Sequence, residues 1–517
     1  MSVADGAAGR PGKANRRTPG MHVDGKSDGS VIPTKQPNKT DGLVAEAVEG
    51  RDPIKGNTGE QNASRTQSRT DAHSALERVR KAAKTDKKRR FTALLHHVSV
   101  DRLREAYLTS KKHAASGTDG VTWQHYGERL EENLQALHAR VHRGAYRAKP
   151  SRRVYIPKSD GRQRPLGIAA LEDKILQRAV VSVMNAVYES DFLGFSYGFR
   201  PGRGAHDALD ALAAGIIRKK VNWVLDADIR GFFDTIDHGW LIKFIEHRIA
   251  DRRVLRLIQK WLRAGVMEQG KRTPTEVGSP QGATASPLLA NICLHYALDL
   301  WVQQWRQRHG HGDIVIVRYA DDFVLGFQHD FDAARFLKDL RERLARFKLE
   351  LHPEKTRLLG FGRFASSRRE ERGQSGAPQT FNFLGLTHCC GRSRSGKFLL
   401  LRHTMKARLT AKVQEITLEM RRRRHQSIVS QGEWLGAVLR GHYAYYGVPT
   451  NIEALDVFRH EITQRWRRSL LRRSQRRRLN WARMARLADR WLPVARIVHP
   501  WPEARFAVRT RDKSPVR

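Results

Sequence analysis

Cysteine is nearly absent from this sequence, with only Cys293, Cys389 and Cys390 in a chain of 517 residues. So few cysteines cannot build the disulfide framework of a small secreted protein or a zinc site made of Cys-x-x-Cys pairs. His388 precedes the last two, but adjacent ligands cannot all face one metal, and no second cluster completes a tetrahedral set. We therefore expect neither disulfides nor structural zinc.

Long hydrophobic runs are also missing. No stretch approaches the about 20 apolar residues that cross a bilayer as a helix, and residues 1–6 lack the apolar segment of a secretory signal. No basic amphipathic helix of the kind that lies on a membrane stands apart from the rest of the chain. The sequence thus predicts a cytoplasmic protein without a membrane partner.

Negative charge is scarce as well. The chain has 95 Lys and Arg residues against 53 Asp and Glu residues, a formal net charge of +42. No ordinary fold requires this excess, which indicates a polyanionic partner, most simply nucleic acid. The hydrophobic content of 40% can still fill a core, and the length suits two to four domains.

Large apolar residues are rare in residues 1–75, which are rich in Gly, Pro, Asn, Ser, Thr and Lys. This composition buries too little surface to offset the entropy lost on ordering the chain. We place a disordered basic extension at residues 1–85, although apolar residues return at helical spacing from Ala75 onward.

Against these absences stand two apolar runs, 314–317 and 323–327, on either side of Asp321 and Asp322. Two runs of β-branched and aromatic residues around a short polar interruption predict a β-hairpin. Adjacent acids at its tip have two explanations, turn formation by Asp or a metal site. Further carboxylates and phosphate-binding groups elsewhere in the chain would favour the metal site.

A second acidic segment runs from Trp223 to Asp234 and reads as a strand that enters a tight turn at Gly231. Side chains alternate between the faces of a strand, so Asp226 and Asp228 share one face. A chain that leaves its sheet soon after Asp228 presents that carboxylate to a cleft. A solvated strand end is the alternative.

Basic and glycine-rich segments complete the set. Residues 152–168 predict a hairpin whose Lys158 and Arg164 can reach a triphosphate or a nucleic-acid backbone, with a solvated loop as the alternative. Farther on, Gly278 and Gly282 lie in a loop that leads into a helix. Glycine at these positions lets the main chain approach a ligand closely.

The last part of the chain is helical and rich in arginine. Apolar spacing predicts helices over 405–420 and 434–446, and from Arg465 onward arginines crowd around tryptophans. Arginine mixed with aromatic residues suits phosphate contact and base stacking. We assign the arginines to nucleic acid and the tryptophans to a small helical core.

Taken in chain order, these segments resemble the reverse transcriptases encoded by bacterial group II introns. The resemblance covers roughly residues 85–450 and is specific as a set, whereas each motif alone is weak. Its motifs are Asp228–Phe233, Ser279-Pro280-Gln281-Gly282, Tyr319-Ala320-Asp321-Asp322, His352–Thr356 and the maturase-like Tyr443–Pro449. Ala283 stands where the family often has glycine, a conservative departure.

The resemblance implies an α+β right-hand polymerase fold, with fingers and palm at 86–395. A helical thumb and maturase (X) region at 396–470 and a basic DNA-binding tail at 471–517 would follow. It also implies an RNA-directed DNA polymerase that binds its parent intron RNA to promote splicing and retromobility. The expected partners are this RNA, a DNA target and primer, and deoxynucleoside triphosphates, and a homodimer stays open.

Many relatives append an HNH endonuclease with cysteine pairs, which this sequence lacks. We therefore expect no second-strand nicking by this chain and another source of primer, such as nascent DNA at a replication fork.

The resemblance also carries functional residues over. Catalysis falls to Asp228, Asp321, Asp322 and Lys355, the lysine as a proton donor to departing pyrophosphate. Two Mg²⁺ ions, with Mn²⁺ as a substitute, would be held by Asp228, Ile229, Asp321 and Asp322. Nucleotide and template–primer contacts fall to Lys158, Arg164, Phe233, Gln281, Gly282 and Tyr319. Phe233 would exclude a ribose 2′-hydroxyl, with a plain core phenylalanine as the alternative.

Two other functions fit parts of the sequence. One is a splicing factor whose polymerase centre is vestigial, and the other is a reverse transcriptase adopted by a host for defence. The intact carboxylates of Asp228, Asp321 and Asp322 argue against the first, because clustered negative charge beside phosphates brings no advantage to a protein that only binds RNA. Intron RNA domains around the reading frame would exclude the second.

Overall fold

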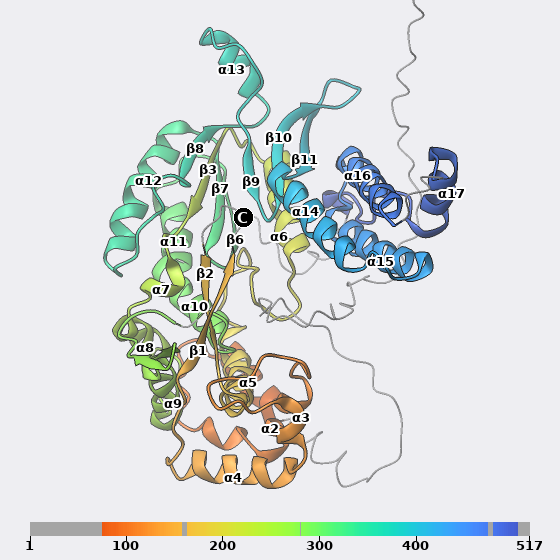
Figure 1. Ribbon diagram of the computed structural model, residues 1–517. Coiled ribbons are helices and arrows are strands. Elements are labelled where there is room, and N and C mark those ends of the chain that lie inside the picture. Colours follow the sequence, from red (N-terminus) through yellow and green to blue (C-terminus); the bar gives the residue numbers. More distant parts are fainter. Residues whose placement is uncertain (1–74, 158–162, 280, 474–478, 505–517) are drawn as a thin grey trace, which may run out of the picture.

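The computed structural model describes residues 75–157, 163–279, 281–473 and 479–504, and shows an α+β protein (Figure 1). Its strands are β1 (Ser151–Pro157), β2 (Gln163–Ile168), β3 (Trp223–Asp228), β4 (Val266–Glu268), β5 (Lys271–Thr273), β6 (Ile314–Tyr319), β7 (Asp322–Phe327), β8 (Arg357–Gly360), β9 (Phe381–Phe383), β10 (Leu386–Arg392) and β11 (Phe398–Thr404). Its α-helices are α2 (Val100–Leu108), α3 (Trp123–Gly127), α4 (Leu130–His142), α5 (Leu171–Tyr188), α6 (Ala205–Arg218), α7 (Phe232–Thr235), α8 (His238–Glu246), α9 (Arg252–Arg263), α10 (Ser286–Leu294), α11 (Leu300–Arg308), α12 (Asp330–Ala345), α13 (Ala365–Glu371), α14 (Lys406–Arg422), α15 (Ile428–Tyr446), α16 (Ile452–Leu471) and α17 (Trp481–Trp491).

The central sheet has the strand order β6-β7-β3-β8 and contains the predicted hairpin as β6 and β7. Helix α12 packs on one face of this sheet and α6 on the other (Figure 1). The alternation of side chains explains this arrangement: Leu225 and Phe323 enter the core on the α12 side, whereas Val224 and Val324 enter the core that α6 covers.

The N-terminal part is mainly helical and begins earlier than the sequence suggested. Residues 75–85 form a helix whose Leu76, Val79 and Ala83 are buried in the same core as α2, α4 and α5. The boundary of the proposed disordered extension at residue 85 is therefore wrong, because these apolar side chains bury enough surface to order the segment. Residues 1–74 lie outside the described part of the chain.

Two further sheets flank the centre. One has the order β2-β1-β4-β5, and in it β1 and β2 pair antiparallel as the predicted basic hairpin, with Pro157 opposite Gln163. The tip of that hairpin, including Lys158, lies outside the described residues. The other sheet, in the order β11-β10-β9, lies beside α6 (Figure 1).

The C-terminal part is a helical bundle of α14 to α17 with a hydrophobic core of its own. Trp466 is fully buried at its centre, and the ring of Trp491 packs so closely on Gly432 that a β-carbon there would overlap it. These two tryptophans anchor a helical core, as expected. Trp481 does not, because it is 52% exposed and lies under the guanidinium of Arg467.

The helix predicted after the loop of Gly278 and Gly282 is interrupted. The chain forms α10, then a π-helical turn at His295–Asp299, and then α11. Such turns are uncommon and often occur near functional sites. Here the turn contains the fully buried Asp299, which pairs with Arg318 beneath the acidic hairpin.

No helix in the described ranges is long and apolar enough to cross a membrane.

Candidate active site

Carboxylates from two strands and a turn lie at one end of the central sheet. Asp226 and Asp228 are on β3, Asp322 is the first residue of β7, and Asp321 occupies the turn before it. Asp228 lies directly opposite Asp322 in the antiparallel register, where side chains have Cβ atoms about 5 Å apart and share a face. The register thus unites the two acidic segments that the sequence singled out.

The turn that carries Asp321 has only two residues between β6 and β7, Ala320 and Asp321. Ala320 has a φ of 58°, a left-handed conformation that an alanine seldom adopts without support from its surroundings. The support comes from the buried Arg318, which donates a hydrogen bond of 2.9 Å to the Ala320 carbonyl.

Burial makes three of these carboxyls harder to ionise, because the pKa values of Asp226, Asp321 and Asp322 are all raised. Burial, followed by the negative charges of Asp321 and Asp228, raises the pKa of Asp322 to about 7. Asp322 keeps an exposed surface, but the protein around it still reduces its hydration. Burial and Asp228 also raise the pKa of Asp321, while Arg164 and Lys355 act to lower it. Like charges held this close favour a bound cation.

Two basic side chains already neutralise part of this charge. Lys355 Nζ forms an ion pair with Asp228 Oδ2, and Arg357 forms one of 3.3 Å with Asp226. Lys355 was expected to serve departing pyrophosphate, and the structure places its amine against a carboxylate of the site. A cation that binds Asp228 through the same oxygen would release Lys355 from this pair.

The donor set suits a hard cation, since carboxylate oxygens are the ligands that Mg²⁺ and Mn²⁺ prefer. The described residues nevertheless contain no group of three His, Cys, Asp or Glu side chains already placed to hold a metal ion. The Asp228 carboxylate instead contacts the amine of Lys355.

Ile229 can contribute only a main-chain oxygen to a metal. The Asp228 carbonyl accepts from His352 N at 2.7 Å, and Arg230 N donates to the Glu350 carbonyl at 2.8 Å. Since backbone groups alternate along a strand, the Ile229 carbonyl points away from these residues, toward the side of β3 on which β7 lies.

The loop of Gln281 and Gly282 is tied to both neighbouring segments. The Gly167 amide of β2 donates to the Gln281 carbonyl at 2.7 Å, and a β-carbon on Gly282 would lie 3.2 Å from the Gly167 carbonyl oxygen. Ser279 N donates to the Phe233 carbonyl at 2.7 Å. This loop therefore links β2 to the segment after β3. Because Gly282 has no side chain, the loop can lie this close to Gly167.

The remaining predicted residues surround this loop and the carboxylates. Arg164 is exposed on β2 and close enough to Asp321 to influence its pKa. Phe233 is half-buried in α7, with its ring edge-on to Phe232. Tyr319 lies opposite Asp322 in the β6–β7 register and near the ring of Phe199.

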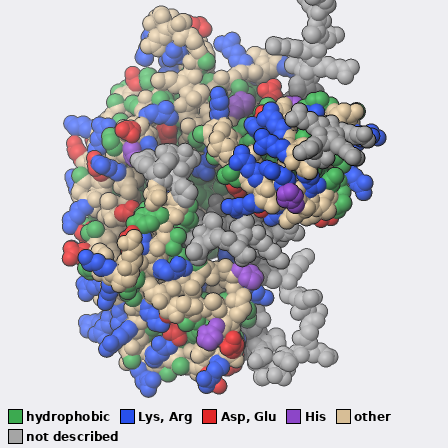
Figure 2. Space-filling model, in the orientation of Figure 1, with side chains coloured by type: hydrophobic (Ala, Val, Ile, Leu, Met, Phe, Trp, Pro, Cys, Tyr) green, Lys and Arg blue, Asp and Glu red, His purple; other side chains and the backbone are tan. Residues whose placement is uncertain are grey.

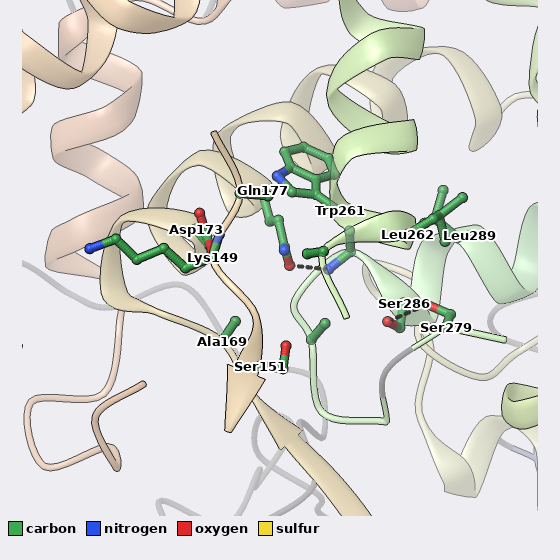
Figure 3. A pocket seen from close by; sticks show the side chains of 14 residues that line it. Lys149, Ser151, Ala169, Asp173, Gln177, Trp261, Leu262, Ser279, Ser286 and Leu289 are labelled. Carbon is green, nitrogen blue, oxygen red and sulfur yellow. Dashed lines mark hydrogen bonds between the residues drawn. The ribbon is translucent and has the colours of Figure 1, made fainter. Parts of the chain in front are cut away.

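A small cavity of about 20 Å³ lies behind the loop, between β1, α5 and α9 (Figure 3). On its wall Gln177 accepts a hydrogen bond of 3.2 Å from the Ala285 amide, and the hydroxyls of Ser279 and Ser286 are 2.6 Å apart. These buried contacts hold both ends of the loop. The cavity has room for about one water, so we assign it a structural role.

Sequence reasoning missed the support beneath the acidic turn. Arg318 is fully buried and forms an ion pair of 2.6 Å with Asp299. It also donates to Asn291 Oδ1 at 3.0 Å and Ser196 Oγ at 2.7 Å. The available signal was an arginine inside an otherwise apolar strand, which must find buried partners because an unpaired charge there is too costly.

Gly198 was missed as well. Its segment runs beside β6, with Tyr197 N donating to the Arg318 carbonyl at 2.9 Å, and a β-carbon on Gly198 would overlap the Ala320 amide nitrogen. We expect Gly198→Ala to displace the acidic turn and to lower the chemical activity of the site about a hundredfold, as a misplacement near 1 Å does.

The matched control for Gly198→Ala is Gly441→Ala, at a helical position where a β-carbon meets nothing within 4 Å. This control should leave the activity unchanged. Equal activity of the two variants, measured as product formed per minute at equal folded concentration, would contradict the close-packing argument.

Comparison with known proteins gives consistent matches. A family model described as "Reverse transcriptase (RNA-dependent DNA polymerase)" matches residues 156–388. Protein YkfC of Escherichia coli (strain K12) is 36% identical over 283 residues, which are 48% of this chain and 74% of YkfC. The group II intron-encoded protein LtrA of Lactococcus lactis subsp. cremoris is 35% identical over 235 residues.

The matches to intron proteins cover only parts of those proteins. The LtrA match spans 45% of this chain and 39% of LtrA. A nuclear intron maturase 2, mitochondrial, of Arabidopsis thaliana is 27% identical over 175 residues, which are 26% of this chain and 23% of the maturase.

Proposed function

Because the chain belongs to the family of reverse transcriptases that group II introns encode, we propose that it copies RNA into DNA and also acts as a maturase. The observation that carries the polymerase role is the register that sets Asp228 opposite Asp322, with Asp321 in the adjoining turn. The maturase role rests on the intron proteins it resembles, and its partner would be the parent intron RNA.

In this proposal Asp228, Asp321 and Asp322 hold two Mg²⁺ ions, with Mn²⁺ as a substitute and the Ile229 carbonyl as a further oxygen. Bound metal would stabilise charge on the attacking and leaving oxygens of nucleotidyl transfer. Lys355, displaced from Asp228, supplies a positive charge or a proton to the departing pyrophosphate. Asp228 and Asp321 are the principal ligands and Asp322 the supporting one.

The other site residues would bind the substrates. Arg164, together with Lys158, neutralises the triphosphate, and the linked loop of Gln281 and Gly282 lies against the nucleotide or template. Phe233 discriminates against a ribose 2′-hydroxyl, and Tyr319 presses on the primer end or the nucleotide.

We further propose that the central sheet and its helices are the palm, and that the N-terminal helices with the β2-β1-β4-β5 sheet are the fingers, together at 75–395. The helical bundle would be the thumb and maturase region. It continues past residue 470, because α17 packs into its core. A DNA-binding role of the basic tail from 471 and a homodimer remain predictions.

The direct test is primer extension by the purified chain on an RNA template with a DNA primer, Mg²⁺ and the four deoxynucleoside triphosphates. We expect full-length DNA. Failure to extend, together with tight binding of intron RNA, would instead support a splicing factor with a vestigial polymerase centre.

The raised pKa of Asp322 predicts a pH-dependent metal requirement. Metal binding needs the ionised carboxylate, and with a pKa of about 7 the ionised fraction falls from about nine tenths at pH 8 to about a tenth at pH 6. We therefore expect half-maximal primer extension at pH 6 to need about tenfold more Mg²⁺ than at pH 8. The same Mg²⁺ requirement at both pH values would contradict this electrostatic account.

The stability of the metal-free protein should show the opposite sign. Since the folded-state pKa of Asp322 lies above the unfolded value near 3.9, this carboxyl favours the folded state at low pH. That contribution is lost as the pH rises from about 4 through 7. Asp322→Asn should flatten this part of the stability profile.

A further inference from the structure

A hollow of about 140 Å³ opens between α14 and α16, far along the chain from the carboxylates. A cavity needs only about 10–15 Å³ of such space to hold one water, so this hollow can accept a larger group. Five arginines line it: Arg421, Arg424, Arg465, Arg468 and Arg472.

The charge in this hollow is not balanced by the protein. None of its lining residues is acidic, and among the described residues only Arg465 of the five arginines forms an ion pair, at 3.0 Å with Glu461. Like charges gathered around one space repel each other, so the arrangement is stable only with an anion or with water between the guanidinium groups.

The walls fit a phosphate in particular. Arginine presents its donors in a planar fork that matches two phosphate oxygens, and Ser469 adds a hydroxyl. The side chain of Met420 is 2% exposed and supplies an apolar wall, where charge-assisted hydrogen bonds are stronger than in water.

The surroundings favour a polymer over a free ion. Arg422 and Arg423 continue the arginine run at the end of α14, and Arg467 and Arg473 flank the α16 side. Lys and Arg side chains gather over this helical bundle in the space-filling view (Figure 2). A chain of phosphates can occupy the hollow and the flanking arginines together.

We propose that the hollow between α14 and α16 is a phosphate-binding pocket for the backbone of RNA. The choice of RNA rests on the proposed function, whereas the phosphate chemistry rests on the five arginines that line the hollow without an acidic side chain among them. The pocket grips one phosphodiester, and the flanking arginines hold its neighbours, so that this bundle fixes the position of the RNA along the protein.

The test compares two triple variants with the same loss of charge. The pocket variant is Arg421→Gln/Arg468→Gln/Arg472→Gln, at exposed positions where the fold does not depend on the side chain. The control is Arg252→Gln/Arg256→Gln/Arg263→Gln, three exposed arginines on α9. The affinity for a fluorescent hairpin RNA is measured between 50 and 200 mM KCl, without nucleotides.

We expect the pocket variant to bind RNA about tenfold to a hundredfold more weakly than the wild type, since each lost charge-assisted contact matters. The slope of log affinity against log salt should fall by about one, the value for one or two lost phosphates. The control should lose less than about threefold. Replacing the same three arginines with lysine should recover part of the affinity, because lysine keeps the positive charge but lacks the planar donor pair of the guanidinium group.

Equal losses in the pocket and control variants would overturn the proposal, since arginines would then act only through total charge. Inorganic phosphate at constant ionic strength separates the two sources of the ligand. If phosphate binds the wild type at a few millimolar but neither phosphate nor the pocket substitutions lower RNA binding, the site takes the free ion and the RNA assignment is wrong. A fall of wild-type RNA affinity in phosphate toward that of the pocket variant supports the proposal, because the ion then competes with RNA for the pocket.

This binding comparison does not depend on DNA synthesis. If the wild type fails to extend primers but the pocket substitutions lower RNA affinity more than the control substitutions do, the polymerase proposal is refuted and the pocket proposal stands. If the wild type extends primers but both variants lose RNA affinity equally, only the pocket proposal is refuted.

Discussion

Asp321→Asn should lower DNA synthesis by a thousandfold or more. The substitution keeps the size of the side chain but removes the ionised oxygen that a metal needs, and metal stabilisation of the transition state is worth several kcal/mol. RNA binding should stay within about threefold of the wild type, because one fewer negative charge does not weaken contact with phosphates. Primer extension and RNA affinity are measured on the same preparation.

The matched control is Asp226→Asn. Asp226 lies on β3, two residues before Asp228 and on the same face of that strand. Its carboxylate pairs with Arg357. We expect it to lower synthesis less than tenfold. Near-normal synthesis by Asp321→Asn, or equal losses in the two variants, would refute the assignment of the turn carboxylate as a principal ligand.

Arg318→Gln should destabilise the protein by about 3–5 kcal/mol in the free energy of unfolding. Arg318 and Asp299 are both fully buried, and breaking such a pair leaves an uncompensated charge in the interior. The Ala320 carbonyl would lose its hydrogen bond as well, so the turn that carries Asp321 would relax. We expect DNA synthesis to fall at least a hundredfold even where the variant is folded.

Urea denaturation followed by circular dichroism measures the first effect, and primer extension at low temperature measures the second. Arg357→Gln is the control for stability, since its ion pair with Asp226 is partly exposed and should contribute less than about 1 kcal/mol. If Arg318→Gln does not fold, Arg318→Lys keeps the charge but lacks donors for all four partners. Wild-type synthesis by that variant would contradict the positioning role.

Much of the fold followed from local pattern. The hairpin of β6 and β7, the strand β3 and the helix α14 all agree with their predicted spans within a few residues. Their apolar side chains recur with the period of the element they form, and that period is a local property of the sequence. The helix predicted after the loop of Gly278 and Gly282 was wrong in detail, because a π-helical turn at His295–Asp299 interrupts it. That turn contains Asp299, whose partner Arg318 comes from a later strand and is not visible in the local pattern.

The individual chemical groups of the candidate site were likewise readable from the sequence. Asp228, Asp321 and Asp322 stood out as carboxylates at strand ends, and Gly282 as a place of close approach. The outcome for Lys355 shows the limit of such reading, because its contact with Asp228 joins residues 127 positions apart.

By itself, the sequence determined the basic character of the protein, the types of its central elements and the identity of the acids that the site uses. Only the tertiary structure decided which acids face each other, what supports the turn beneath them and where arginines converge on one hollow. The physical reason is that periodicity and turn chemistry act over a few residues. The register of β3 with β7, the burial of Arg318 and the arginine pocket arise from packing between distant segments, whose free energy depends on the whole fold.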